Sequence, residues 1–256
     1  MTGTDTGVGK TFLTALLLRH LRRRNVPTLA IKPFSSGDRH DAELLKTLQQ
    51  GDLRLEEVNP FFFRAPLAPF VAARKTRRDI DLGEVLEYVC SIQERFRQPK
   101  ITSRQGRMET PILLIEGVGG LLVPLGRNFS VLDLINALQC EVLVVSRNQL
   151  GTLNHTLLTI RALQNPRRKI SSGACAVGKC KRRFERVGRE QHAVKLVLVD
   201  QEFPDESASS NAEILRELVA PIRVHKLPFF IGNCLFVKAI EQVEKKIEKT
   251  LAQILR

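Results

Sequence analysis

The 256-residue sequence contains no long hydrophobic run and no basic-then-apolar pattern at its amino terminus. A membrane-spanning helix needs roughly 18 or more consecutive apolar residues, and no stretch approaches that length. A secretory signal would place basic residues before an apolar segment. We therefore expect a cytoplasmic protein that has no membrane partner.

Cysteine is also scarce, with five residues that are odd in number and scattered along the chain. This usage predicts reduced thiols, because a disulfide framework needs paired cysteines at regular spacings. Cys175 and Cys180 have four residues between them and no second pair follows, so we expect no zinc site. No internal repeat and no clear linker divides the sequence, and its length suits one domain over residues 1–256.

Aromatic residues are almost absent from the most basic part of the chain. The formal net charge is +13, and residues 161–195 contain eleven Lys or Arg against two Glu, which supplies +9 of it. Such a charge suggests a nucleic-acid partner. However, Phe184 is the only aromatic residue in this window, so a base-stacking platform is not indicated. We interpret the window as a solvated basic loop and expect no nucleic-acid partner.

Glycine gathers at the amino terminus, in Gly3-Thr4-Asp5-Thr6-Gly7-Val8-Gly9-Lys10-Thr11. Small residues let successive backbone N–H groups turn towards an anion, and the apolar run that follows predicts a helix whose positive end adds to the same site. Lys10 would reach the β- and γ-phosphates, and the Thr11 hydroxyl would bind Mg²⁺. The alternative is a glycine-rich turn before a helix, since Gly-Lys-Thr alone is common by chance.

Two features of this loop depart from the usual pattern. Thr4 stands where the strict motif has glycine, and Gly3 lies one position earlier. Only Met1 and Thr2 precede Gly3, whereas a phosphate loop normally follows a buried strand. We therefore expect either that the first strand is missing or that the true start lies upstream.

Hydrophobic patterns predict alternating strands and helices along the rest of the chain, which favours a parallel sheet with helices on both faces. Residues 59–73 are predicted to be an ordered loop that leads into a short helix. The expected strands are 28–31, 111–116, 141–146, 172–177, 196–199 and 222–227, and the expected helices include 12–24, 81–97, 131–139, 211–218 and 235–255.

Charged residues follow two of the predicted strands, at the sheet edge where open α/β sheets bind ligands. Lys32 follows residues 28–31, and Glu116 ends the strand 111–116 in front of a glycine-rich segment. Glu116 is expected to hold a metal ion or its water. Asp41 could simply cap the next helix, or it could face a Mg²⁺ ion, which prefers oxygen ligands. The sequence leaves both readings of Asp41 open.

The segment from Gly151 to His155 opens a further predicted helix, whose N–H groups could hold an anionic group of a substrate. His155 is interpreted as structural, because no acidic residue neighbours it. The sequence contains no Cys/His or Ser/His/Asp arrangement that would indicate a covalent nucleophile.

Taken in order, these motifs resemble the dethiobiotin synthetase family. The resemblance covers residues 2–160, and residues 221–230 more loosely. It rests on the phosphate loop, Lys32-Pro33 with Ser35-Ser36-Gly37, Asp41-Ala42, Asn59-Pro60, the strand-end segment 116–125 and Leu150-Gly151-Thr152-Leu153-Asn154-His155.

The resemblance implies a P-loop NTPase-like three-layer α/β sandwich with a mostly parallel central sheet. It also implies an enzyme that uses ATP, Mg²⁺ and CO₂ to close the ureido ring of 7,8-diaminopelargonate, and a homodimer in which the loop 150–154 serves the partner's site. The implied residues are Thr6, Gly7, Val8, Gly9, Lys10 and Thr11 for ATP; Thr11, Asp41 and Glu116 for Mg²⁺; Lys10, Lys32 and Ser36 for catalysis; and Ser36, Gly119, Gly120, Leu150, Gly151 and Asn154 for the substrate.

One further departure concerns the base of the nucleotide. In the family, an asparagine at the end of the strand near residue 177 reads adenine, whereas this sequence has Val177-Gly178-Lys179. Residues 174–199 match the family poorly, so we expect a relaxed nucleotide preference or reduced activity.

Two other functions share parts of this pattern. A glutamine-dependent amidoligase of the cobyric acid type would need a glutamine-hydrolysing domain with a cysteine nucleophile, and the sequence has none. A partitioning-type ATP switch would bind DNA through the basic window. Such switches carry a second lysine early in the phosphate loop, and positions 5 and 6 here are Asp5 and Thr6.

Overall fold

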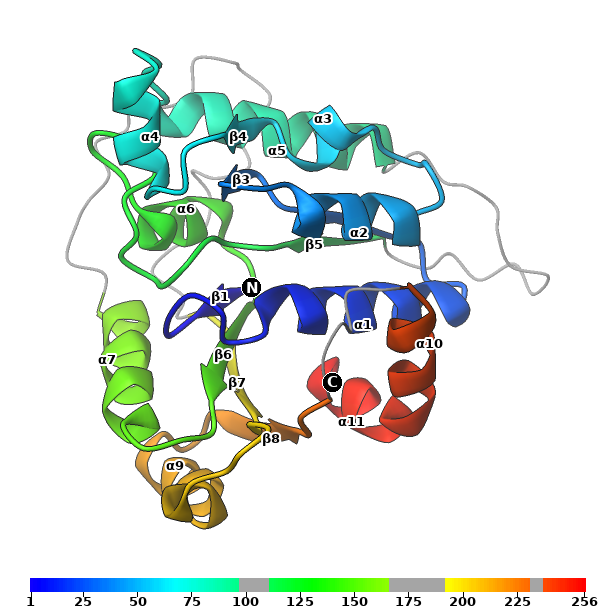
Figure 1. Ribbon diagram of the computed structural model, residues 1–256, viewed down its shortest axis with the longest axis vertical. Helices are drawn as coiled ribbons and strands as arrows, with labels where there is room; N and C mark the ends of the chain where they lie inside the picture. The colour runs from blue at the N-terminus through cyan, green and yellow to red at the C-terminus, as the bar shows by residue number, and fades with distance from the viewer. Residues whose placement is uncertain (97–110, 166–191, 231–236) are drawn as a thin grey trace.

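The computed structural model describes residues 1–96, 111–165, 192–230 and 237–256 and has an α/β fold, as predicted, with helices on both sides of parallel strands (Figure 1). The strands are β1 (Thr2–Gly3), β2 (Thr28–Ile31), β3 (Phe34–Ser36), β4 (Phe61–Phe63), β5 (Ile112–Ile115), β6 (Val142–Arg147), β7 (Val194–Val199) and β8 (Arg223–Leu227). The helices are α1 (Lys10–Arg23), α2 (His40–Leu48), α3 (Leu55–Val58), α4 (Pro69–Lys75), α5 (Leu82–Phe96), α6 (Val131–Leu138), α7 (Thr152–Gln164), α9 (Asn211–Leu218), α10 (Val237–Lys246) and α11 (Glu248–Ile254), with a 3₁₀ turn at Glu206–Ser209.

The strands pair in parallel, as their βα connections require. One sheet has the order β1-β6-β7-β8, β2 pairs with β5, and β3 pairs with β4. The backbone of Met1 joins the first two groups, because its nitrogen donates to the Ile115 oxygen at 2.7 Å and its oxygen accepts from Gly117 N at 2.9 Å. The carboxyl ends of β2, β5 and β1 therefore lie beside one another.

The strands β6 and β7 are buried on both faces, which explains their continuous apolar sequences. Their side chains alternate between two hydrophobic cores. Val144 and Leu196 belong to the core beneath α5, α6, α7 and α9, whereas Val145 and Val197 belong to the core beneath α1, α2, α10 and α11. These two cores define the three-layer arrangement that the resemblance implied.

The chain begins with a strand of only two residues, and the expectation that the first strand is missing or starts upstream stays a prediction. Thr2 and Gly3 form the short strand β1, in which they pair with Val144 and Val145 of β6. Thr2 is fully buried, and Thr4 N continues the pairing with a bond to Val145 O at 2.9 Å. These first residues have backbone hydrogen-bond partners on both sides, in β5 and its following residue and in β6.

Two other stretches were predicted only in part. The short helix expected at the end of residues 59–73 is confirmed as α4, but the part predicted as a loop contains the strand β4, which pairs with a second unpredicted strand, β3. The predicted closing helix 235–255 is two helices, α10 and α11, separated at Ile247. Ile247 is nearly buried and has non-helical dihedral angles (φ −114°, ψ 20°), so core packing turns the chain although no glycine or proline marks the break.

Some predictions fall on residues outside the described ranges. They include the strand predicted over 172–177, Val177 itself and most of the basic window 161–195. Among the described cysteines Cys140 is free, whereas Cys90 is disulfide-bonded, so the expectation of reduced thiols is wrong for Cys90. No helix in the described ranges is long and apolar enough to cross a membrane.

Candidate active site

The loop between β1 and α1 has the geometry of an anion-binding turn. Gly7 and Gly9 adopt left-handed φ angles of 69° and 98°, which residues with a side chain disfavour. Gly9 caps α1 without a side-chain hydrogen bond, and the first turn of α1 contains no acidic residue. The first N–H groups of this helix therefore face the loop, and the helix has no acidic residue of its own at the positive end of its dipole.

Gly3 explains the unusual spacing of the loop. A Cβ at this position would lie 2.8 Å from Val8 Cγ2, 2.9 Å from Asp5 O and 2.9 Å from Lys10 Nζ. Lys10 thus folds back across Gly3, and its Nζ donates to Asp5 O at 2.8 Å. Thr4 is accommodated because its hydroxyl points away and donates to Ser146 Oγ at 3.1 Å.

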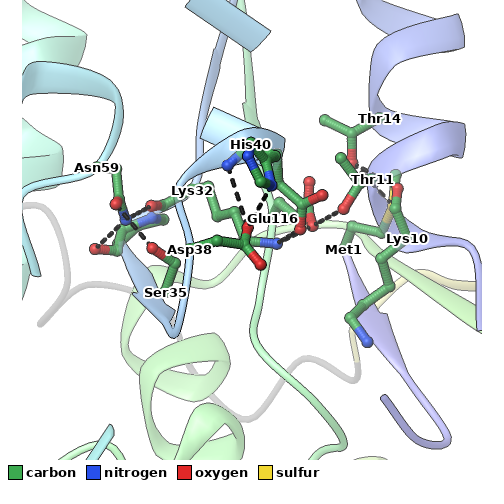
Figure 2. Close-up of polar contacts among 12 residues, drawn as sticks. Met1, Lys10, Thr11, Thr14, Lys32, Ser35, Asp38, His40, Asn59 and Glu116 are labelled. Atoms are coloured by element: carbon green, nitrogen blue, oxygen red, sulfur yellow. Dashed lines mark hydrogen bonds and ion pairs between the residues drawn. The ribbon is translucent and has the colours of Figure 1, made fainter. Parts of the chain in front are cut away.

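Four predicted residues meet in one polar cluster beside the loop (Figure 2). Lys32 Nζ donates to Asp41 Oδ2 at 2.6 Å and to Glu116 Oε1 at 2.5 Å. The same Glu116 oxygen accepts from the Thr11 hydroxyl at 2.6 Å. We call Thr11, Lys32, Asp41 and Glu116 the acidic centre. Residues separated by as many as 105 positions therefore touch one another.

The fold brings these side chains together because each belongs to the end of an element. Lys32 directly follows β2 and Glu116 directly follows β5, and these two strands are paired in register. Thr11 lies in the first turn of α1, and Asp41 lies in the first turn of α2. Asp41 does not cap α2, which begins after Arg39 without a side-chain cap. Of the two readings of Asp41 that the sequence left open, helix capping is therefore excluded.

Burial and charge determine the pKa values in the acidic centre. Burial alone would lower the pKa of Lys32, but the carboxylates of Glu116 and Asp41 raise it above the ordinary value for lysine. Burial lowers the pKa of Lys10 to about 8, and neighbouring Lys32 adds to this effect although Glu116 opposes it. Lys32 is therefore firmly cationic, while Lys10 gains stabilisation from any anion that binds in the loop.

The oxygen atoms of the acidic centre fit a divalent cation. Glu116 is fully buried, yet its Oε2 atom has no hydrogen-bond partner. Two carboxylates against one ammonium leave a net charge of −1, and the Thr11 hydroxyl adds a neutral oxygen. No group of three or more His, Cys, Asp or Glu side chains that could hold a metal occurs in the described ranges, so such a cation would also need oxygen from Thr11 or from a ligand.

Two supporting residues were not identified as such from the sequence. Asn59 is fully buried, donates from Nδ2 to Lys32 O at 2.7 Å and accepts at Oδ1 from Ser35 Oγ at 2.8 Å. It therefore fixes the segment that carries Lys32 (Figure 2). Arg147, at the end of β6, donates to Thr6 O at 3.0 Å. For Asn59 the sequence signal was its place in an Asn-Pro motif. For Arg147 the signal was its position directly after the predicted strand 141–146.

The predicted substrate residues fall into two groups. Gly120 bridges to Gly3, and a Cβ at Gly119 would lie 3.5 Å from Thr6 Oγ1, so this pair lies against the phosphate loop. Ser36 is half-buried at the end of β3. By contrast, Leu150, Gly151 and Asn154 belong to the start of α7, and no hydrogen bond or ion pair among the described residues joins them to the acidic centre.

The start of α7 is nevertheless connected to the phosphate loop. Ser146 Oγ is 2.8 Å from Thr152 Oγ1, and it also accepts from Thr4. Leu150 N donates to Asp205 Oδ2 at 2.7 Å, while the Leu150 side chain is 79% exposed. His155 is exposed, and its Nδ1 and Nε2 atoms make no hydrogen bond or ion pair to the described residues. These contacts leave the apolar and amide side chains of Leu150 and Asn154 directed outwards.

Comparison with known proteins gives consistent matches. A family model described as an AAA domain matches residues 1–181. A protein of Bacillus licheniformis named ATP-dependent dethiobiotin synthetase is 39% identical over 164 residues, which cover 62% of this chain and 64% of that protein. Proteins of the same name from Endomicrobium trichonymphae and Methanocaldococcus jannaschii are 38% and 34% identical, and the matches cover 74% and 72% of their lengths.

The family model ends at residue 181, and each relative matches only part of the chain. The chain spans 64% and 66% of the Bacillus licheniformis and Bacillus subtilis relatives. The matched portion carries the phosphate loop and the acidic centre. Neither the family model nor these relatives support an amidoligase or a partitioning-type switch.

Proposed function

We propose, because the chain belongs to the dethiobiotin synthetase family, that it catalyses the ATP-dependent carboxylation and ring closure of 7,8-diaminopelargonate. One amine captures CO₂ as a carbamate and releases a proton. A carbamate oxygen then attacks the γ-phosphorus of ATP, and ADP departs. The second amine attacks the carbamate carbon, and inorganic phosphate leaves as the five-membered ureido ring closes.

The observation that carries this proposal is the acidic centre beside the phosphate loop. Phosphoryl transfer to a carbamate joins two anions, and it therefore depends on positioning and on neutralisation of charge rather than on a covalent nucleophile. Lys32 is buried and held cationic by Glu116 and Asp41. Lys10 lies across the loop with its Nζ on a backbone carbonyl that an anion can replace as partner.

Each predicted residue has a role in this proposal. Lys10 binds the β- and γ-phosphates together with the backbone of Thr6 to Thr11, while Lys32 neutralises the transferring group and the carbamate. Ser36 binds the substrate from β3. Gly119 and Gly120 receive the diamine end, which is supported by their position against Gly3 and Thr6.

Mg²⁺ is the proposed metal cofactor, held by Thr11, Asp41 and Glu116. When bound, it would neutralise the phosphate oxygens during transfer. Support comes from the partnerless Oε2 atom of Glu116 and from the hard oxygen donors around it. This chain's own contribution is to hold the two carboxylates apart by means of Lys32 and to exclude water from Glu116.

We also propose that the protein acts as a cytoplasmic homodimer in which Leu150, Gly151 and Asn154 bind the substrate carboxylate at the partner's site. Leu150, which precedes α7, and Leu158 on α7 have 79% and 59% of their surfaces exposed. Such apolar exposure is costly in a monomer and would be relieved in a dimer. The left-handed Gly151 leaves the amide groups at the start of α7 available to an anion.

The proposal is tested by incubating the chain with MgATP, bicarbonate and 7,8-diaminopelargonate. ADP release should depend on all three, and mass spectrometry should detect dethiobiotin in equal amount. Lys10→Gln should abolish turnover, whereas Arg216→Gln on the exposed face of α9 should retain it. Binding of MgATP without diamine-dependent ADP release would overturn the proposal.

A further inference from the structure

A cavity of about 270 Å³ is lined by residues at the carboxyl end of α4 and in the turn before α6. The helix α4 lies apart from the phosphate loop that precedes α1 (Figure 1). The cavity shares no residue with the phosphate loop or the acidic centre. Phe70, Ala73, Ile80 and Gly126 provide its apolar surface. Its charged residues come from two segments that are far apart in the sequence: Arg74 lies in the last turn of α4, Arg77, Arg78 and Asp79 follow this helix, and Arg127 lies in the turn before α6.

The arginines of this cavity are only partly neutralised. Arg78 pairs with Glu84 at 3.2 Å and lies over the Phe61 ring at 5.1 Å, while Arg74 lies over the Phe70 ring at 5.7 Å. The side chains of Arg77 and Arg127 make no hydrogen bond or ion pair to any described residue. The lining residues carry four guanidinium groups and the Asp79 carboxylate, and with Glu84, the partner of Arg78, the charges sum to +2.

Ordinary structural roles account for Arg74 and for Arg78, which pairs with Glu84, but not for Arg77 and Arg127. Arg74 lies in the last turn of α4, where a cation is favourable to the helix dipole. Arg127 belongs to no helix and comes from a different segment. Its turn is fixed tightly, because a Cβ on Gly126 would lie 2.4 Å from Ile80 O and 2.2 Å from Phe129 Cε1. The backbone therefore presents Arg127 at a defined position beside the residues that follow α4.

From this arrangement we propose that the cavity binds a small molecule that carries a phosphate or carboxylate group. Guanidinium groups match the planar or tetrahedral oxygens of such groups through paired N–H donors. Arg77 and Arg127 contact the anionic group, and Phe70 and Ile80 contact the rest of the molecule. The volume accommodates a small metabolite but no nucleotide polymer.

The cavity is also connected to the segments of the proposed active site. Arg78 lies over Phe61, whose ring stacks on Phe34 at 4.8 Å, and Phe34 follows Lys32-Pro33. On the other side, Phe70 N donates to Pro124 O at 3.2 Å, in the segment that follows Gly119 and Gly120. A molecule bound in the cavity would therefore contact residues that pack against the Lys32 segment and against the segment after Gly120. It would not enter the phosphate loop.

Calorimetric titration with inorganic phosphate at low ionic strength tests the site. A non-hydrolysable ATP analogue and Mg²⁺ are present throughout so that the phosphate loop, including its γ-phosphate position, is filled. The parent chain should bind phosphate saturably, and Arg77→Gln and Arg127→Gln should each weaken binding about tenfold, which corresponds to one lost charged hydrogen-bond partner. Arg216→Gln removes an exposed arginine from α9 and should leave the affinity unchanged.

A second titration distinguishes a phosphate from a carboxylate as the natural anionic group. Succinate is titrated in the same way, and competition with phosphate would show that either oxyanion occupies the site, with the tighter binder marking the natural class. Thermal unfolding of each variant confirms that it remains folded. The proposal is overturned if neither anion binds saturably, if a variant that combines Arg77→Gln with Arg127→Gln binds as the parent does, or if Arg216→Gln loses as much affinity as Arg127→Gln.

Discussion

The substitution Glu116→Gln measures what the negative charge of Glu116 contributes to the acidic centre. The substitution keeps the size of the side chain and an oxygen that can accept from Thr11 and Lys32. It removes the negative charge that lies 2.5 Å from the Lys32 ammonium. Lys32 would then depend on Asp41 alone, whose side chain is 34% exposed.

The expected cost follows from the burial of the pair. The side chains of Lys32 and Glu116 are 8% and 0% exposed. Loss of one partner from a buried ion pair typically costs about 3–5 kcal/mol, because the other charge stays buried. Asp41 still compensates Lys32, so we expect the lower end, about 3 kcal/mol. For a chain of this size that corresponds to a fall in Tm of roughly 6–12 °C.

Urea unfolding followed by circular dichroism measures this free energy, and Glu56→Gln is the matched control. Glu56 has a side chain that is 73% exposed and lies 3.7 Å from Arg39, so its loss should change the stability by no more than about 0.5 kcal/mol. Calorimetry should show in addition that Mg²⁺ no longer strengthens ATP binding to Glu116→Gln. If the two variants were equally stable, the acidic centre would not be a buried, coupled unit and the reasoning would be wrong.

Three further predictions concern the loop, a surface ion pair and the dimer. Gly3→Ala should weaken ATP binding at least about tenfold in calorimetry, because the new Cβ would displace Lys10 Nζ; unchanged affinity would contradict the assigned close contact. The Arg95 guanidinium and the Arg54 backbone amide lower the pKa of Glu57 to about 2, so the folded state binds this proton less readily than the unfolded chain. The ion pair should therefore stabilise the fold by about 1 kcal/mol above pH 4.5, and the advantage over Glu57→Gln should vanish as the pH falls towards 2 in urea titrations; a difference that does not depend on pH would refute this. Leu158→Asp should convert the proposed dimer to a monomer in light scattering, and an unchanged mass would remove α7 from the interface.

The regular part of the fold could be predicted from local sequence pattern. Residues 28–31 were predicted as a strand and form β2, and residues 211–218 were predicted as a helix and form α9. Each has a hydrophobic pattern of sufficient length to distinguish strand from helix. By contrast, β3 and β4 have three residues each, which is too short for a period to emerge. Their pairing depends on tertiary contacts.

Individual residues of the site could be predicted from the sequence, but the contacts between them could not. Lys32 and Glu116 stand out because charged residues at the ends of buried strands are unusual. Their ion pair spans 84 positions and depends on the register of β2 and β5, which no local pattern specifies. Asn59 illustrates the same limit, since its hydrogen bonds to the Lys32 segment arise only after β3 and β4 have paired.

The transfer of one oxygen atom tests the proposed reaction most directly. Bicarbonate labelled with heavy oxygen is mixed rapidly with the chain, MgATP and 7,8-diaminopelargonate, and the inorganic phosphate is examined by mass spectrometry. Because a carbamate oxygen attacks the γ-phosphorus, the account predicts that released phosphate carries one labelled oxygen. Phosphate released without label, in amounts equal to the dethiobiotin formed, would contradict it.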